Sequence, residues 1–361
     1  MEEKALHFQP GERFPKEMAI PQYPDLVRTL KDYGIDGVCT ATLIDSTHDA
    51  EDIRLNYIID RKWVLRYCKA PEITEEYLRD LSRLVERYRR LNIRCPRFIP
   101  DENGVYLHTW NQLNCYLSEY VDLPLADSRK LQNPDRLIRE VAESVALFAQ
   151  TYKNVDLSRT MGMYSLFDLC PFDLPNGIDE KEDNFRHLLE TLRNMGENRL
   201  AEKLDARHGE VRQKLKAVYQ TLPRCVFQGD ENFSNVLIDQ DEHFAGLIDF
   251  NLAGTEVVVN QLDNLAGFDY DEKNKAPEGA AKRLDAAIRY FREHAAPMLK
   301  VYHATETEKK AMGWYAWIVM IAQWPTLCYF RDSLTGEMQS ETLELLSLIA
   351  EVPEERLMEG L

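Results

Sequence analysis

Apolar positions along the first third of the chain predict short strands and one strong helix. Alternating apolar residues over 42–67 and 104–121 indicate β-strands, and the first stretch contains a polar turn at 60–62. Between them, leucines recur every three or four residues over 74–91 among arginines and glutamates. This spacing predicts an amphipathic helix whose N-cap is Thr74. An earlier helix is predicted over 25–33, with Gly34 as its stop.

Beyond Pro124 the apolar spacing becomes helical. Helices are predicted over five ranges: 136–152, 182–196, 200–222, 279–299 and 306–330. The exception is a β cluster over 224–250. These patterns predict an α+β fold with a boundary near 119–122. Residues 1–120 are expected to form an N-terminal lobe and residues 121–361 a larger, mostly helical C-terminal lobe.

Composition narrows the class of partner. The 361 residues are 44% hydrophobic and 29% charged, with a formal net charge of -17. An acidic protein of this kind is a poor match for nucleic acid or for an anionic membrane, which attract basic surfaces. A cationic small molecule is electrostatically compatible with the charge, whereas the oligomeric state leaves no trace in the sequence.

The cysteines and the hydrophobic runs bear on location. Seven scattered cysteines form no C-x-x-C pair, and no apolar signal segment follows Met1, so we expect a cytoplasmic protein. The charge-free run at 311–330 is long enough to cross a bilayer. Gln323 and Pro325 interrupt it, which favours a buried helix instead.

The residues with the clearest chemical meaning lie between Gln228 and Phe250. Two apolar strands there are joined by a polar turn at 240–243, which predicts a hairpin. Asp230 and Asn235 precede the first strand and Asp249 follows the second, so we expect all three to lie close together. Phosphoryl transfer uses such a group: a carboxylate that takes the proton of the accepting hydroxyl, and an amide and a carboxylate that hold Mg²⁺. The alternative is an unrelated hairpin with solvated acids.

This segment resembles the aminoglycoside phosphotransferase and choline kinase family. Its members carry Gly-Asp-x4-Asn and, about a dozen residues later, an Ile-Asp-aromatic element, as in Gly229–Asn235 and Ile248–Phe250 here. The resemblance implies a bilobal protein-kinase-like fold, ATP or GTP as phosphoryl donor, and Mg²⁺. It also implies that Asp230 is the catalytic base and that Asn235 and Asp249 are the metal ligands.

The same resemblance assigns phosphate-binding residues in the N-terminal lobe. Val64-Leu65-Arg66 is similar to the family's strand that carries a basic residue for the α- and β-phosphates, so Arg66 is the candidate. Its carboxylate partner is expected on the following helix, at Glu86 or Glu76. Each of these glutamates is equally well explained as a surface charge.

Two backbone segments are expected to hold the nucleotide. The phosphate-covering loop would be 45–51, where Ser46 and Thr47 supply hydroxyls in the absence of glycine. A plain turn is the competing interpretation. Ser118-Glu119-Tyr120-Val121 is similar to the hinge that binds adenine, which makes Glu119, Tyr120 and Val121 cofactor-binding candidates.

The sequence also departs from the family pattern. Gln228 replaces the histidine that usually braces the catalytic loop, although glutamine can still donate and accept hydrogen bonds. The family's Asp-Leu-Ala, which opens a bracing helix, corresponds to Asp263 or Asn264 followed by Leu265 and Ala266.

The predicted function is a small-molecule kinase that phosphorylates a hydroxyl of an aminoglycoside, choline, amino alcohol or thiosugar. A catalytically weak binding scaffold and a metal-dependent hydrolase are the alternatives. The acceptor is expected in the helical lobe. An aromatic stripe there, Trp314, Tyr315, Trp317 and Trp324, suits a cation or sugar, but core packing explains it better. Acids within 171–183 could line the entrance, although a solvated loop is the simpler interpretation.

Overall fold

The structure is a computed structural model that describes residues 16–38, 40–47, 52–171, 173, 176–271 and 278–361. The chain divides into two compact units. The first contains residues 1–130 and 232–249, and the second contains residues 131–231 and 250–361. The predicted boundary at 120/121 is a simpler division, because it assigns residues 232–249 to the C-terminal lobe.

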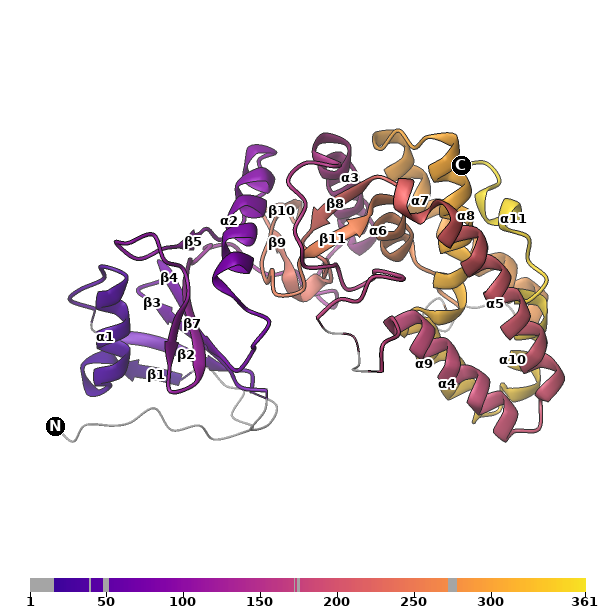
Figure 1. Ribbon diagram of the computed structural model, residues 1–361, viewed down its shortest axis with the longest axis horizontal. Helices are drawn as coiled ribbons and strands as arrows, with labels where there is room; N and C mark the ends of the chain where they lie inside the picture. The colour runs from indigo at the N-terminus through magenta and orange to yellow at the C-terminus, as the bar shows by residue number, and fades with distance from the viewer. Residues whose placement is uncertain (1–15, 39, 48–51, 172, 174–175, 272–277) are drawn as a thin grey trace. The chain divides into compact units, whose positions relative to one another are not determined.

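An antiparallel sheet forms the body of the first unit (Figure 1). Its strands, in spatial order, are β1 Lys16–Ala19, β2 Thr40–Asp45, β3 Arg54–Ile59, β4 Trp63–Cys68, β7 Leu113–Glu119 and β5 Phe98–Ile99, with β6 His108–Trp110 also on β7. The predicted turn between β3 and β4 is confirmed. Its residues Asp60 and Arg61 have φ values of 50° and 52°, the positive φ that a tight hairpin turn requires.

Two helices pack with this sheet. The helix α1 Pro24–Asp32 buries Leu26 and Leu30 in the same apolar cluster as the sheet residues Ile59 and Leu65. The helix α2 Glu75–Arg90 begins where the sequence predicts, since the Thr74 hydroxyl accepts a hydrogen bond from the Tyr77 N–H at 3.1 Å. The 3₁₀ turn η1 Ile20–Gln22 precedes α1.

The hairpin of β9 Val236–Ile238 and β10 Phe244–Leu247 is predicted correctly and belongs to the first unit. The Arg94 N–H donates to the Ala245 carbonyl at 2.8 Å, and the Arg94 carbonyl accepts from the Leu247 N–H at 2.9 Å. A Cβ atom at Gly246 would lie 2.0 Å from the Arg94 carbonyl oxygen, so this contact requires glycine. These long-range backbone bonds explain why a hairpin so late in the chain joins the N-terminal sheet unit.

The second unit is mostly helical around a two-stranded sheet of β8 Arg224–Phe227 and β11 Gly254–Val257. Its helices are α3 Pro134–Tyr152, α4 Glu180–Asn194, α5 Asn198–Val218, α6 Val258–Ala266, α7 Ala280–Val301, α8 Glu306–Ala322, α9 Trp324–Leu334, α10 Gln339–Ile349 and α11 Glu354–Met358. The 3₁₀ turn η2 Tyr219–Thr221 follows α5.

The predicted helix over 306–330 is two helices. It breaks at Gln323, because Pro325 stands at the start of α9 and cannot continue the preceding helix. Tyr315 and Trp317 on α8 are fully buried, which confirms core packing for them, whereas Trp324 on α9 is 54% exposed. Among the described residues, no helix is long and apolar enough to cross a membrane.

Candidate active site

Arg66 and Asp249 come together within the first unit. Arg66 lies on the central strand β4, and its Nη1 is 3.3 Å from Asp249 Oδ1 and 3.4 Å from the hydroxyl of Tyr116 on β7. Burial disfavours the charged guanidinium, but the Tyr116 and Asp249 oxygens outweigh burial and raise the pKa of Arg66. Arg66 is therefore a fixed positive charge beside one of the two expected metal ligands.

The two predicted metal ligands flank the β9–β10 hairpin. Asn235 ends the 3₁₀ turn η3 Phe233–Asn235 and is 6% exposed, and its carbonyl accepts from the Ile248 N–H at 2.9 Å. Asp249 comes directly after Ile248 and has a φ of 55°, a left-handed conformation that aspartate tolerates better than most residues. The hairpin thus places an amide and a carboxylate on facing ends of adjacent strands.

This pair of side chains suits Mg²⁺, because an amide oxygen and a carboxylate are hard ligands. Among the described residues, no group of three or more His, Cys, Asp and Glu side chains gathers around a common point. A kinase-type magnesium site does not need such a group, since water and phosphate oxygens complete the coordination. The contact between Asp249 and the Arg66 cation shows that this carboxylate already attracts positive charge.

Ser46 and Thr47 have structural partners in the first unit. The Ser46 hydroxyl donates to the Arg54 carbonyl at 3.3 Å, and the Thr47 hydroxyl accepts from the Arg54 N–H at 3.1 Å. Thr47 is only 4% exposed. These bonds close the turn onto β3, as the plain-turn interpretation expects. Residues 48–51 of the predicted phosphate loop lie outside the described residues.

The predicted hinge spans the end of β7 and the two residues after it, and several of its polar groups are already bonded. The Glu119 carboxylate lies 3.0 Å from Arg89 Nη1 and 3.4 Å from Arg97 Nη1. The Tyr120 N–H donates to the Lys62 carbonyl at 2.7 Å, and the Val121 carbonyl accepts from the Leu123 N–H. Glu119 therefore anchors the segment through its side chain.

The expected pairing of Arg66 with Glu86 is not formed. Glu86 bonds to Arg97 Nε at 2.7 Å, and both side chains of that pair are more than 40% exposed. Arg97 lies in the segment that follows α2 and offers Glu86 a nearby cation. Glu76 is an exposed residue in the first turn of α2. Arg66 takes its carboxylate contact from Asp249 instead.

The candidate catalytic base belongs to the second unit. The segment after β8 turns at Gly229, whose φ is +87° and whose Cβ position would lie 2.5 Å from the Leu252 carbonyl oxygen. The Asp230 N–H donates to the side-chain oxygen of Gln228 at 2.7 Å, and Gln228 is fully buried. Gln228 therefore braces the loop, as expected of the residue that replaces histidine. The approach of Asp230 to Asn235 and Asp249 remains a prediction of the sequence.

Sequence reasoning missed Glu231 and misplaced the brace on α6. Glu231 Oε2 accepts a hydrogen bond from Gln261 Nε2 at 3.0 Å. Asp263 is fully buried, and neither of its carboxylate oxygens has a hydrogen-bond partner in the described structure. Burial raises the pKa of Asp263. Residues 263–266 close α6 and do not open it. The signal for Glu231 was its place in the motif, directly after Asp230.

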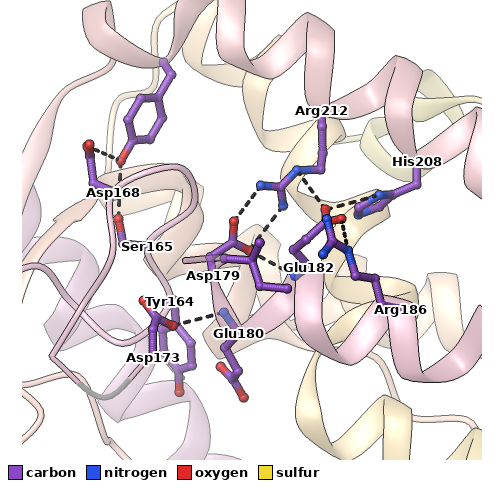
Figure 2. Close-up of polar contacts among 12 residues, drawn as sticks. Tyr164, Ser165, Asp168, Asp173, Asp179, Glu180, Glu182, Arg186, His208 and Arg212 are labelled. Carbon is purple, nitrogen blue, oxygen red and sulfur yellow. Dashed lines mark hydrogen bonds and ion pairs between the residues drawn. The ribbon is translucent and has the colours of Figure 1, made fainter. Parts of the chain in front are cut away.

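The acids expected at the entrance have structural partners (Figure 2). Asp179 caps α4 and pairs with Arg212 Nη1 at 3.2 Å, and Asp173 accepts from the backbone N–H groups of Cys170 and Glu180. Arg212 also approaches Glu182 at 3.4 Å. Asp173 and Asp179 therefore stabilise the segment around the start of α4 through contacts within the protein.

Solved structures identify the class of fold. An aminopropanol kinase associated with microcompartments has 12% identity and a TM-score of 0.51, over 92% of this chain and 96% of that one. An amicoumacin kinase in complex with AMP-PNP and Ca²⁺ has 12% identity and a TM-score of 0.51, over 87% of this chain and 89% of that kinase. A spectinomycin phosphotransferase has 14% identity and a TM-score of 0.49, over 92% and 98%. The two structures with a TM-score of 0.51 show that the chain has their α+β, protein-kinase-like fold.

The family follows from the sequence itself. Residues 44–259, more than half of the chain, match the profile of the phosphotransferase enzyme family APH. No curated protein sequence matches the chain. The chain belongs to the phosphotransferase enzyme family and is an enzyme of the kinase class, as the sequence predicts.

Proposed function

We propose that this phosphotransferase transfers the γ-phosphoryl group of ATP to a hydroxyl group of a small cationic metabolite. Asp230 takes the proton of the hydroxyl, Asn235 and Asp249 hold Mg²⁺, and Arg66 binds the phosphates. The observation that carries the proposal is the Gly-Asp-x4-Asn segment followed by a hairpin and Ile-Asp-Phe. It folds with Asp249 beside a strand arginine.

The chemistry asked of these side chains is mainly positioning and charge. When bound, Mg²⁺ neutralises charge on the phosphate oxygens and orients them for displacement. The fixed charge of Arg66 suits phosphate, which arginine holds through its planar set of N–H donors. The brace from Gln228 fixes the backbone of Asp230, so that its carboxylate can meet the hydroxyl proton with little loss of orientation.

A cavity in the second unit supports a cationic acceptor. It has a volume of about 820 Å³, within the usual range for small-molecule sites. Its walls carry three aspartates and three tyrosines: Asp269, Asp271, Asp332, Tyr270, Tyr290 and Tyr329. Among the described residues that line it, the one arginine, Arg283, pairs with Glu341 at 2.9 Å. Aspartates and aromatic rings together favour an organic ammonium ion.

The cavity also lies near the catalytic loop along α6. Asn264 lines the cavity and Gln261 bonds to Glu231, the neighbour of Asp230. These two α6 residues are three positions apart, which is about 4.5 Å along a helix axis. The name of the aminopropanol kinase describes an acceptor with both an amine and a hydroxyl, which is the chemistry proposed for this cavity.

The decisive experiment is an acceptor screen. The purified chain is given Mg-ATP or Mg-GTP with a panel of amino alcohols, aminoglycosides, choline and neutral sugars, and acceptor-dependent ADP or GDP release is measured. We expect ATP and at least one amine-bearing alcohol to give turnover. Turnover with neutral sugars alone would contradict the cationic acceptor, and nucleotide hydrolysis that no acceptor stimulates would indicate a hydrolase.

The Asp230→Asn variant tests the base. It keeps the size of the side chain, so we expect nucleotide binding within about twofold of the parent protein. The rate should fall by about 10²-fold or more, in the range of general-base catalysis. Calorimetric nucleotide titration and product release measure the two effects. Persistent turnover in Asp230→Asn would show that Asp230 is not the base.

Two further features stay predictions under this proposal. We propose a cytoplasmic location. The cysteines in the described part of the chain form no disulfide with one another, which supports a reducing compartment. The domain roles are those of the sequence prediction: residues 1–120 bind the nucleotide, and residues 121–361 carry the catalytic loop and the acceptor site.

A further inference from the structure

Glu231, the residue after the proposed base, turns its side chain onto α6. Its Oε2 accepts from Gln261 Nε2 at 3.0 Å, and Gln261 is only 1% exposed. Its Oε1 is buried and has no hydrogen-bond partner in the described structure. This carboxylate is therefore held by the protein through Gln261, and its Oε1 is closed to solvent.

The residues that precede Asp230 are also fixed by contacts within the second unit. The Gln228 side chain accepts from the Asp230 N–H at 2.7 Å, and Gly229 packs against the Leu252 carbonyl. Asp230 thus lies between two residues whose side chains are bonded inside the second unit. Loss of either bond would let the loop rotate about the neighbouring peptide.

The helix α6 gives this contact a rigid base. Asn260 Nδ2 donates to the Tyr164 carbonyl at 2.7 Å, and Gln323 Nε2 donates to the Asn264 carbonyl at 2.9 Å. The Asp263 carboxylate has no hydrogen-bond partner within the described residues, so it does not supply the expected brace. The side chain of α6 that bonds to the loop is Gln261.

We propose that Glu231 and Gln261 form a positioning pair that fixes the catalytic loop on α6 and thereby sets the direction of the Asp230 carboxylate. The proposal rests on the proposed role of Asp230 as base. Both side chains act through Asp230 and touch no reactant, so their loss should lower kcat more than it changes the KM for ATP. A displacement of about 1 Å at a catalytic group can cost about 10²-fold in rate.

The test compares Glu231→Leu, Gln261→Met and Glu231→Gln in the full-length chain. We expect Glu231→Leu and Gln261→Met to lower kcat by about 10- to 100-fold while the KM for ATP stays within about twofold. Glu231→Gln keeps a side-chain oxygen that can accept from Gln261, so it should retain kcat within about threefold. The double variant should be no slower than the slower single variant, because both changes remove one contact.

Hydrogen–deuterium exchange of the peptide that contains residues 226–236 gives a readout that needs no acceptor. Exchange there should be faster in Glu231→Leu and unchanged in Glu231→Gln. Unchanged exchange in Glu231→Leu would overturn the pair whatever the activity, and so would a loss in Glu231→Gln as large as in Glu231→Leu. If Gln261→Met fails to fold, Glu231→Leu against Glu231→Gln still decides.

The matched control is Glu351→Leu, which removes a carboxylate from an exposed pair with Lys203 in the same unit. It should leave kcat and loop exchange unchanged. The Asp230→Asn variant separates the two proposals. Normal turnover in that variant would show that Asp230 is not the base, whereas the exchange data test the pair of Glu231 and Gln261 alone.

Discussion

A single contact, with Asp249, distinguishes Arg66 from other arginines on the strands of the sheet. On β4 it is a strand arginine like many others, but its Nη1 lies 3.3 Å from Asp249, a residue 183 positions later in the chain. The Asp249 side chain is 39% exposed, so the pair itself should contribute less than about 1 kcal/mol to stability. We therefore expect Arg66 to contribute mainly to ligand binding and little to the stability of the fold.

Replacement of this arginine should separate binding from stability. We expect Arg66→Ala to raise the KM for ATP by about 10- to 100-fold through the loss of charge-assisted bonds to phosphate, with a change in Tm below about 3 °C. Arg66→Lys, the matched control, keeps the charge and should lose less. Steady-state kinetics and thermal denaturation measure both quantities. An unchanged KM would refute the assignment.

Glu256 on β11 is a buried acid whose contribution to the free energy of unfolding depends on pH. It is 1% exposed, and burial raises its pKa to about 7, although Asn260, the Val257 N–H, Lys181 and Arg224 favour the charged form. The unfolded chain releases this proton near its ordinary pKa of 4.5. Between these two values the native state binds the extra proton, so stability falls as pH rises from about 4.5 to 7.

Glu256→Gln should remove this pH dependence. From pKa values of 4.5 and about 7, the difference in unfolding free energy between variant and parent should shift in favour of the variant by about 3 kcal/mol from pH 4.5 to pH 8. Urea denaturation at several pH values provides the measurement. A constant difference across this range would show that the native pKa of Glu256 is ordinary.

At the scale of elements, the catalytic loop depends on one glycine between β8 and the following turn. Gly229 combines a φ of +87° with a Cβ position 2.5 Å from a backbone oxygen, so the loop and the Leu252 peptide can meet only without a side chain. The hairpin of β9 and β10 uses Gly246 in the same way against Arg94.

Gly229→Ala should therefore displace the loop. We expect a loss of more than about 1 kcal/mol in unfolding free energy and a fall in kcat of at least about tenfold. Gly209→Ala is the matched control, because Gly209 lies within α5 with nothing near its Cβ position. It should stabilise the helix by roughly 0.5–1 kcal/mol. Equal effects of the two variants would argue against a strained loop.

At the scale of the whole molecule, nucleotide binding should be visible as stabilisation. A ligand at 100 times its Kd adds about 2.7 kcal/mol to the stability of the native state. We expect Mg-ATP at millimolar concentration to raise Tm by several degrees, and ATP with EDTA to raise it less.

Asp249→Asn should lose the magnesium-dependent part of this shift, and asparagine tolerates the left-handed backbone at that position. Thermal scans of both proteins with ATP, Mg-ATP and Mg²⁺ alone make the comparison. If the Tm shift of the parent protein with ATP is the same with and without Mg²⁺, Asp249 is not a metal ligand.

The sequence by itself determined the local elements and the motif. Apolar spacing fixed the strands β2 to β4, the helix α2 with its Thr74 cap and the β9–β10 hairpin, because each depends on neighbours a few residues apart. The family also followed, since the Gly-Asp-x4-Asn and Ile-Asp-Phe elements lie within one short segment.

Tertiary structure decided the partners. It paired Arg66 with Asp249 and Glu86 with Arg97, and it tied Glu231 to Gln261. It also buried the Asp263 carboxylate without a hydrogen-bond partner in the described part of the chain and joined residues 232–249 to the first unit. Each of these contacts except Glu86 with Arg97 joins residues at least about 30 positions apart or depends on burial. A side chain has several possible partners at such range, and packing selects among them by distance and solvation, which the local sequence does not encode.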